Sequence, residues 1–233
     1  MKISIIGYGR MGQAIEKIAK ERGHEIAYIN NGEVLDIDAI KATDVALEFT
    51  QPTAALSNVK GILSTGTPVI SGTTGWLKFK NEADSAAEKN RTGFLYASNF
   101  SLGVHLFFVI NEKLAALMAP HKEYKPQVHE IHHTGKKDAP SGTAITTAEG
   151  IIAAYPELKN WSGEKAPGSL QITDERIDPY CGTHIVTYTS SIDKITLEHH
   201  AFSREGFAQG AVLAAEWILG KEGVFTMRDV LGL

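Results

Sequence analysis

The sequence predicts an α/β fold, with an N-terminal Rossmann-like domain on a parallel sheet and a smaller α+β domain for the substrate. Three observations support this prediction. A glycine-rich turn separates an isoleucine-rich run from a helical pattern at the N-terminus. Apolar runs and helical patterns then alternate up to about residue 100, as in parallel sheets. Beyond that point a long apolar helix and polar strands follow, which indicates a second domain.

The first domain opens with a βαβ unit. Residues 2–6 contain three isoleucines and predict a strand, residues 7–12 form a tight turn, and apolar residues then recur at helical spacing until Gly23. Residues 25–29 predict the second strand. Further strands are expected over 44–49, 67–71 and 94–97, with helices over 53–63, where Thr53 is a candidate cap, and over 80–90.

The second domain does not continue the regular alternation of strands and helices. A helix is expected over 102–117, a polar strand over 127–133, a helix over 142–154, a loop over 155–170, and strands over 183–190 and 194–202. A last helix over 207–219 carries an apolar stripe and is expected to return to the first domain. The predicted boundaries are therefore 1–100 with 206–233 for the dinucleotide-binding domain, and 101–205 for the substrate domain.

Composition excludes several classes of partner. The net charge is −4 and the pI is near 6.1, so there is no global basic field for nucleic acid or an anionic membrane. Cys181 is the single cysteine, and one thiol makes no disulfide framework. The N-terminus lacks the pattern of a signal peptide, and there is no apolar run of about 18 residues. We expect a cytoplasmic protein without nucleic-acid or membrane partners.

The glycine-rich turn fits the dinucleotide fingerprint G-x-G-x-x-G. Gly7 permits the tight turn, Gly9 lets the backbone approach a pyrophosphate, and Gly12 lets the helix pack close to the strand. The start of the helix would then hold the diphosphate. A glycine turn without a ligand is the alternative, and the βαβ context favours the cofactor. The predicted contacts here are Gly7, Tyr8, Gly9, Arg10, Met11 and Gly12.

The choice between NADH and NADPH stays open. An acidic residue at the end of the second strand selects NAD, and an arginine selects NADP, but this sequence has Asn30 and Asn31 there. Asn30 is a predicted contact, because an amide can bind a hydroxyl or a phosphate. The loops at 50–53, 72–75 and 97–100 follow other strands of the sheet and are small and polar, so they are also expected to reach the cofactor.

Residues 129–144 hold the densest chemistry. Histidines suit proton transfer near neutral pH, lysines follow them, and Ser141, Gly142 and Thr143 open a helix that can seat a carboxylate. Metal binding by His129, His132 and His133 is an alternative that no matching cysteine or carboxylate cluster supports, so no metal is expected. The lysines could form a solvated face, and Ser-Gly-Thr could be a simple cap. On alternation, His132 and His133 would point to opposite faces of the strand.

At this stretch the sequence resembles the dihydrodipicolinate reductases, also called 4-hydroxy-tetrahydrodipicolinate reductases. The family pattern E-x-H-H-x-x-K-x-D-A-P-S-G-T-A matches residues 130–144, and 44–52, 72–75, 97–104, 203–204 and 207–211 support it. Four departures concern cofactor choice and assembly more than reaction type. The glycine loop is one residue shorter, the second strand ends without charge, residues 182–184 read Gly-Thr-His where Gly-Glu-His is common, and the chain is short for the family.

The resemblance implies roles for individual residues. His132 would be the general acid and Lys136 its partner, which holds the substrate and its developing negative charge. The implied substrate contacts are His133, Ser141, Gly142, Thr143 and Arg204, and the implied nicotinamide-side residues are Gly72, Thr73, Thr74, Ala97, Ser98, Asn99 and Phe100. Family members reduce a cyclic dicarboxylate with NADH or NADPH in lysine and diaminopimelate synthesis. They are usually homotetramers built through the substrate domain.

Two rival functions remain at this point. Another two-domain Rossmann dehydrogenase, such as an amino-acid dehydrogenase, would share the fold but does not need this order of histidines, lysine and Ser-Gly-Thr. A nicotinamide sensor would keep the glycine loop but need not keep His132 and Lys136. Because both residues are present, catalysis is favoured.

Overall fold

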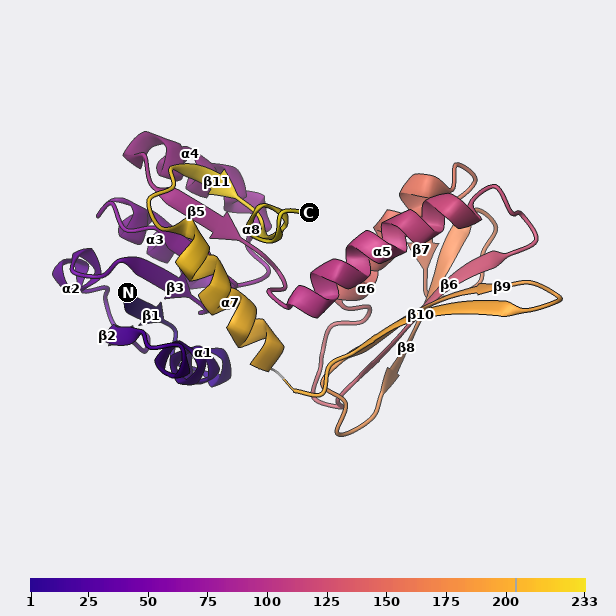
Figure 1. The fold of residues 1–233 in the computed structure, drawn as a ribbon, viewed down its shortest axis with the longest axis horizontal. Coiled ribbons are helices and arrows are strands. Elements are labelled where there is room, and N and C mark those ends of the chain that lie inside the picture. The colour runs from indigo at the N-terminus through magenta and orange to yellow at the C-terminus, as the bar shows by residue number, and fades with distance from the viewer. Residues whose placement is uncertain (204) are drawn as a thin grey trace. The chain divides into compact units, whose positions relative to one another are not determined.

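The computed structural model describes residues 1–203 and 205–233, and the chain divides into two units (Figure 1). The first unit consists of Met1–Leu102 and Glu205–Leu233, and the second of Gly103–Arg204. Among the described helices, none has the length and apolar content needed to cross a membrane.

The first unit is built on a six-stranded parallel sheet in the order β11-β5-β4-β3-β1-β2. Its strands are β1 (Lys2–Ile6), β2 (Glu25–Asn30), β3 (Val45–Glu48), β4 (Val69–Ser71), β5 (Gly93–Tyr96) and β11 (Gly223–Phe225). Its helices are α1 (Arg10–Glu21), α2 (Ile37–Lys41), α3 (Pro52–Leu63), α4 (Lys80–Asn90), α7 (Glu205–Ile218) and α8 (Met227–Leu231), with a 3₁₀ turn at Leu77–Phe79.

Both faces of this sheet are covered, and each has its own apolar core. On one face Ile15 of α1 and Val212 of α7 pack with Ile5 of β1. On the other face Val59 of α3 and Ala83 of α4 pack with the neighbouring strand residues. Central parallel strands that are buried on both sides read as continuous apolar runs. That pattern was visible in the sequence, and the predicted α/β class is confirmed.

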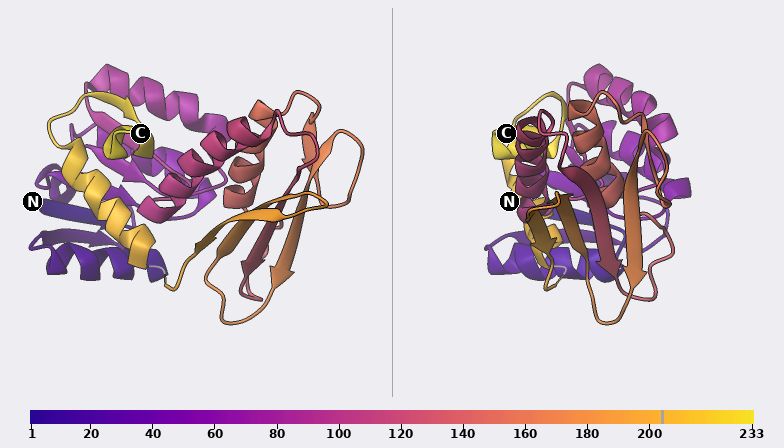
Figure 2. Two further views of the ribbon diagram at one scale, coloured as in Figure 1. Left: turned by 45° about the vertical axis from the view of Figure 1, so that its right-hand side comes forward. Right: turned by 90° about the vertical axis from the view of Figure 1, so that its right-hand side faces the viewer.

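The second unit is built on a five-stranded mixed sheet in the order β10-β9-β6-β8-β7. Its strands are β6 (Lys125–His132), β7 (Asn160–Ser162), β8 (Ser169–Arg176), β9 (Thr183–Thr189) and β10 (Lys194–His200). The helices α5 (Leu102–Met118) and α6 (Gly142–Ala154) pack on one face of the sheet (Figure 2), where Phe107 and Ala148 join a buried cluster with Val128 and Tyr188.

Several elements were not expected from the sequence. The loop predicted over 155–170 contains β7 and the start of β8, so that prediction was wrong in part. β8 has only two buried apolar residues, Leu170 and Ile172, and its tail is polar. Parallel pairing with β6 over six residue pairs holds it in the sheet. The short elements α2, β11 and α8 were also missed, since three to five residues carry no readable period.

Candidate active site

The predicted cofactor residues of the first unit all lie where parallel strands end. The loop with Gly7, Tyr8 and Gly9 follows β1, and Arg10, Met11 and Gly12 begin α1; Asn30 ends β2, Gly72, Thr73 and Thr74 follow β4, and Ala97, Ser98, Asn99 and Phe100 follow β5. Carboxyl ends of parallel strands share one edge of a sheet, and this edge is where open α/β sheets bind ligands. The fold therefore brings the predicted cofactor residues to one edge.

The three fingerprint glycines have different tasks. Gly7 has φ +96°, and a Cβ there would lie 2.2 Å from the carbonyl oxygen of Phe49. A Cβ on Gly12 would lie 2.3 Å from the carbonyl oxygen of Gly7. A Cβ on Gly9 would meet no atom within 4 Å. Gly7 and Gly12 are therefore required by the fold itself, whereas the space above Gly9 is open and suits a pyrophosphate.

The start of α1 also fits an anion. The N-cap residue Gly9 offers no side chain to the first-turn N–H groups, and the first turn contains no acidic residue. Helix N-termini attract phosphate through unpaired N–H groups and the helix dipole. This end of α1 therefore fits the diphosphate of a dinucleotide.

We expect Gly9→Ala to weaken the binding of NADH and NADPH by at least about tenfold, or about 1.4 kcal/mol. The new methyl group would have no clash in the protein itself but would occupy the open space. Titration of the protein with each nucleotide, followed by fluorescence or calorimetry, measures this.

Gly163→Ala is the matched control, because a Cβ there also meets nothing within 4 Å. Both variants should melt like the parent protein. Unchanged nucleotide affinity in Gly9→Ala would place the cofactor elsewhere.

A buried carboxylate, which the sequence analysis did not single out, organises this edge. Glu48 ends β3 with no exposed surface. It accepts hydrogen bonds from Ser71 Oγ at 2.7 Å and Thr73 Oγ1 at 2.8 Å, and from the hydroxyl of Thr50. Burial raises the pKa of Glu48 despite these donors. Glu48 thus holds Thr73 in place. In the sequence, Glu48 could have been identified as the single acidic residue at the end of the apolar run 45–47.

The side chain of Asn30 makes hydrogen bonds within its own part of the chain. Its Nδ2 donates to Tyr28 Oη and to the carbonyl of Glu33, each at 3.1 Å, and its Oδ1 accepts from the Gly32 amide at 3.1 Å. The side chain is buried. Contact of Asn30 with the cofactor stays a prediction.

In the second unit, β6 places charged groups in the core. Along this strand Val128, Glu130 and His132 are buried, while His129 and Ile131 alternate with them and are half-buried. His129 bonds Thr173 of β8, with 2.8 Å between Nδ1 and Oγ1. Since His129 and His132 occupy opposite faces of the sheet, the three histidines of the motif do not converge on one ligand set.

His132 lies in a cluster of three buried titratable side chains. Its Nδ1 is 3.4 Å from Glu130 Oε2, and His184 Nε2 is 3.6 Å from the same oxygen. The two imidazole rings meet edge to face with centroids 5.2 Å apart. Burial, above all, lowers the pKa of His132 to about 4, although the charge of Glu130 opposes this shift. His132 is therefore neutral at neutral pH in the free protein.

The other oxygen of Glu130 ties the cluster to the next elements. Glu130 Oε1 accepts from the Ser141 amide at 3.0 Å and from Arg176 Nη2 at 3.2 Å. Burial alone would raise the pKa of Glu130, but interactions with His184 and Ser141 outweigh it and hold that pKa below its usual range. Glu130 is thus a buried anion at neutral pH.

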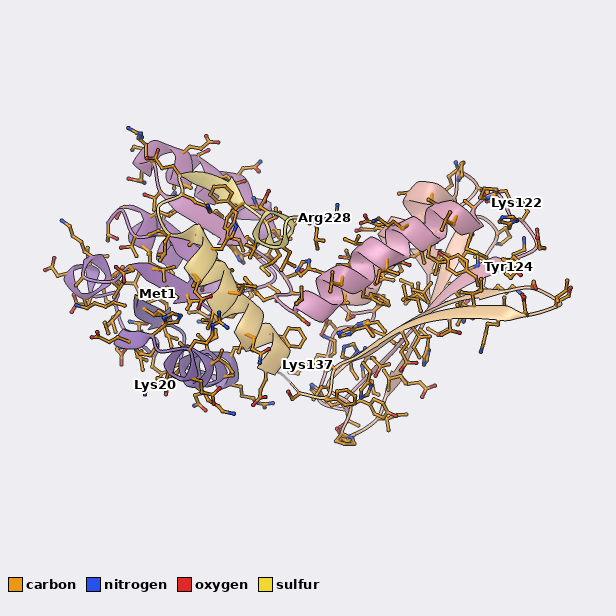
Figure 3. All side chains as sticks on the ribbon, viewed as in Figure 1. Met1, Lys20, Lys122, Tyr124, Lys137 and Arg228 are labelled. Atoms are coloured by element: carbon orange, nitrogen blue, oxygen red, sulfur yellow. The ribbon has the colours of Figure 1, made fainter. Side chains whose placement is uncertain are left out.

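Lys136 lies just beyond β6 and is paired with an acid. Its Nζ is 2.8 Å from both carboxylate oxygens of Asp138, and its side chain is 22% exposed. Lys137 is exposed, and it lies at the end of the unit away from Lys122 and Tyr124, which precede β6 (Figure 3). Of the two lysines, Lys136 is therefore the one held against the site, and Lys137 is the solvated one.

The start of α6 could bind a carboxylate at Gly142 and Thr143, whereas Ser141 is buried and caps the helix. Ser141 is the N-cap, accepts from the Ala144 amide at 3.1 Å and is 3% exposed. Its hydroxyl also lies 3.2 Å from His184 Nε2. Gly142 is exposed with open space around it, Thr143 is half-buried, and His133 is half-buried beside the end of β6. Ser141 therefore belongs to the buried framework of the helix start, and contact of Gly142, Thr143 and His133 with a substrate stays a prediction.

Arg204, predicted as a substrate contact, lies outside the described residues. Three residues of the cluster had no role assigned from the sequence: Glu130, Arg176 and His184. Glu130 opens the family motif and His184 lies just after Gly182, so both residues could be noted in the sequence. No local sequence pattern indicated that the two side chains lie close together. Arg176 lies on β8, which the sequence analysis missed.

Both halves of the chain match one family of known proteins. Residues 1–100 match the model of the dihydrodipicolinate reductase N-terminus, and residues 103–231 match that of its C-terminus. The chain is 46% identical to the 4-hydroxy-tetrahydrodipicolinate reductase of Christiangramia forsetii, over 99% of this chain and 98% of that protein. It is 38% identical to the enzyme of the same name from Bdellovibrio bacteriovorus, over 99% and 96%.

Solved structures show the same fold. A dipicolinate-bound dihydrodipicolinate reductase from Paenisporosarcina sp. TG-14 superposes with a TM-score of 0.77 at 21% identity, and covers 97% of both chains. A meso-diaminopimelate dehydrogenase variant from Clostridium tetani superposes less closely, with a TM-score of 0.57 at 14% identity over 98% of this chain and 94% of that one. The predicted resemblance is confirmed by the two family matches and the full-length relatives, and the chain belongs to the dihydrodipicolinate reductase family.

Proposed function

We propose that this chain is a 4-hydroxy-tetrahydrodipicolinate reductase, an oxidoreductase that uses NADH or NADPH to reduce a cyclic dicarboxylate to tetrahydrodipicolinate in lysine and diaminopimelate synthesis. The relatives named above carry this activity in their names. The observation that carries the proposal is the buried His132 at the end of β6, beside Lys136 and the open start of α6. These groups suit a dianionic substrate that takes up a hydride and a proton.

The residues divide the reaction between them. The nicotinamide supplies the hydride, and the loops after β1, β4 and β5 are proposed to hold it. His132 is proposed to give the proton that completes reduction. Lys136 is proposed to exchange Asp138 for a substrate carboxylate and to stabilise the developing negative charge. His133, Gly142 and Thr143 are proposed to bind carboxylate groups at the helix start.

We also propose a homotetramer in the cytoplasm. Among the described residues, no helix of the second unit packs on the face of its sheet opposite α5 and α6 (Figure 2). On that face, residues such as Ile131, Thr173 and Ile185 are only half-buried. A second copy of the chain would cover them, and light scattering on the purified protein measures the assembly.

The function is tested by the rate at which nicotinamide absorbance is lost. The substrate is generated in place from pyruvate and aspartate semialdehyde by its synthase, with NADH and NADPH in parallel. Oxidation that depends on the generated substrate is the expected result, and the ratio of the two rates identifies the preferred reductant. If folded, nucleotide-binding protein oxidises neither cofactor, the assignment is wrong and another dehydrogenase activity must be sought.

A further inference from the structure

Glu130 occupies a position in the core where an apolar side chain is the usual choice. Its side chain has no exposed surface, and a buried carboxylate is costly unless it is paired and hydrogen-bonded. Both oxygens have neighbours: Oε1 accepts two hydrogen bonds, from Ser141 and Arg176, and Oε2 faces His132 and His184. Burying the carboxylate of Glu130 costs free energy, and the side chains that it faces indicate its role.

Strand register, rather than a loop, fixes this cluster. Glu130 and His132 lie two residues apart on β6 and so share one face of the sheet. His184 of β9 is the direct partner of Glu130, and Arg176 of β8 is the direct partner of His132. Side chains set by the ladder of three neighbouring strands are held more rigidly than side chains on a loop. The carboxylate oxygen is therefore a fixed reference point for the imidazole.

We propose that Glu130 is a positioning residue that acts through His132: Oε2 orients the imidazole by its Nδ1 and favours its protonated form, and His184 competes for the same oxygen. This inference rests on the proposed function, in which His132 gives the proton.

The geometry leaves the other ring nitrogen for the reaction. An imidazolium donates from both nitrogens, so Nδ1–H can stay directed at Glu130 Oε2, 3.4 Å away, while the proton on Nε2 goes to the substrate. His132 is then left neutral with its hydrogen on Nδ1, and one proton has moved in total. A Cβ on Gly182 would lie 3.2 Å from His132 Nε2, so the glycine keeps space beside this atom. Glu130 plays the part that a buried carboxylate plays behind a catalytic histidine.

The charges around His132 give the direction of the expected effect. Glu130 on β6 favours the charged imidazole, whereas burial opposes it, as do His184 on β9, Lys136 in the loop after β6 and Arg176 on β8. Behind them, His199 of β10 pairs with His184 across the ladder, and its own pKa is lowered by burial and by that neighbour. Removing the charge of Glu130 must therefore lower the pKa of His132, and removing His184 must raise it.

The test compares Glu130→Gln, His184→Asn and the parent protein. Glu130→Gln keeps the shape of the side chain and removes its charge. Its kcat is expected to fall by about 10–100-fold with KM for the nucleotide unchanged, part of the usual range for general acid catalysis. Because a general acid works only while protonated, activity is lost as pH rises through its pKa. That alkaline limb is expected to move to lower pH by about one unit in Glu130→Gln and to higher pH in His184→Asn.

A second readout is independent of turnover. The pKa of His132 in the free protein, followed by NMR of labelled histidine, should shift in the same two directions. Glu175→Gln is the matched control, because Glu175 faces His129 Nε2 at 3.6 Å on the opposite face of the same sheet and is 53% exposed. It should change neither the rate nor the pH profile.

The outcomes separate the inference from the function. If Glu130→Gln is slow but both readouts stay at the parent's pH, Glu130 is only structural and the inference is overturned. If Glu130→Gln does not fold, His184→Asn decides, and an unmoved or lowered alkaline limb overturns the inference. If the parent protein has no reductase activity, the proposed function fails, while the NMR shift still tests the pairing of Glu130 with His132.

Discussion

Replacing His132 with alanine is expected to lower kcat by about 10²–10⁴-fold, the usual contribution of a general acid or base. The imidazole is buried at the end of β6 beside Glu130, and burial holds its pKa at about 4 in the free protein. A dianionic substrate favours the charged imidazole, so the pKa seen in the kcat profile should lie above that value. Steady-state rates across pH measure both effects.

His129→Ala is the control for this variant, because His129 comes from the same strand but faces the other side of the sheet. It should keep its rate within about twofold. Both variants should bind nucleotide, since the fingerprint loop belongs to the first unit. A near-parental rate in His132→Ala would remove this residue from the mechanism.

Replacing Lys136 with alanine is expected to lower kcat/KM by about 10²–10⁴-fold, if the lysine both binds the substrate and stabilises its developing charge. In the structure Nζ is paired with both oxygens of Asp138 at 2.8 Å, a geometry that a substrate carboxylate can take over. The variant also removes a positive charge that lowers the pKa of His132. Its alkaline limb should therefore move to higher pH, which the same rate measurements show.

Lys137→Ala tests whether charge alone matters. Lys137 is the exposed neighbour in the sequence (Figure 3), so it carries the same charge without the same placement. Its rate should stay within about twofold of the parent. Equal losses in the two lysine variants would point to general attraction of an anionic substrate rather than a specific role for Lys136.

Local patterns predicted much of the fold. The βαβ opening, the strands 44–49 and 67–71 and the helices 53–63 and 80–90 all correspond to observed elements within a few residues. Buried apolar residues mark these elements locally, in a continuous run at 45–47 and four residues apart at Ala83 and Ala87, so a short window of sequence holds the information. β8 was missed because only Leu170 and Ile172 mark it, and its pairing with β6 is what makes it a strand.

The sequence by itself determined the cofactor fold, the chemistry and the family, because the glycine fingerprint and the stretch from Glu130 to Ala144 are continuous in the chain. Only the tertiary structure decided how His132 is held. Glu130 and Arg176 are 46 residues apart, and they meet, together with His184, through strand pairing. Periodicity reports which face a side chain occupies, but the choice of neighbouring strand and register comes from burial of the whole sheet.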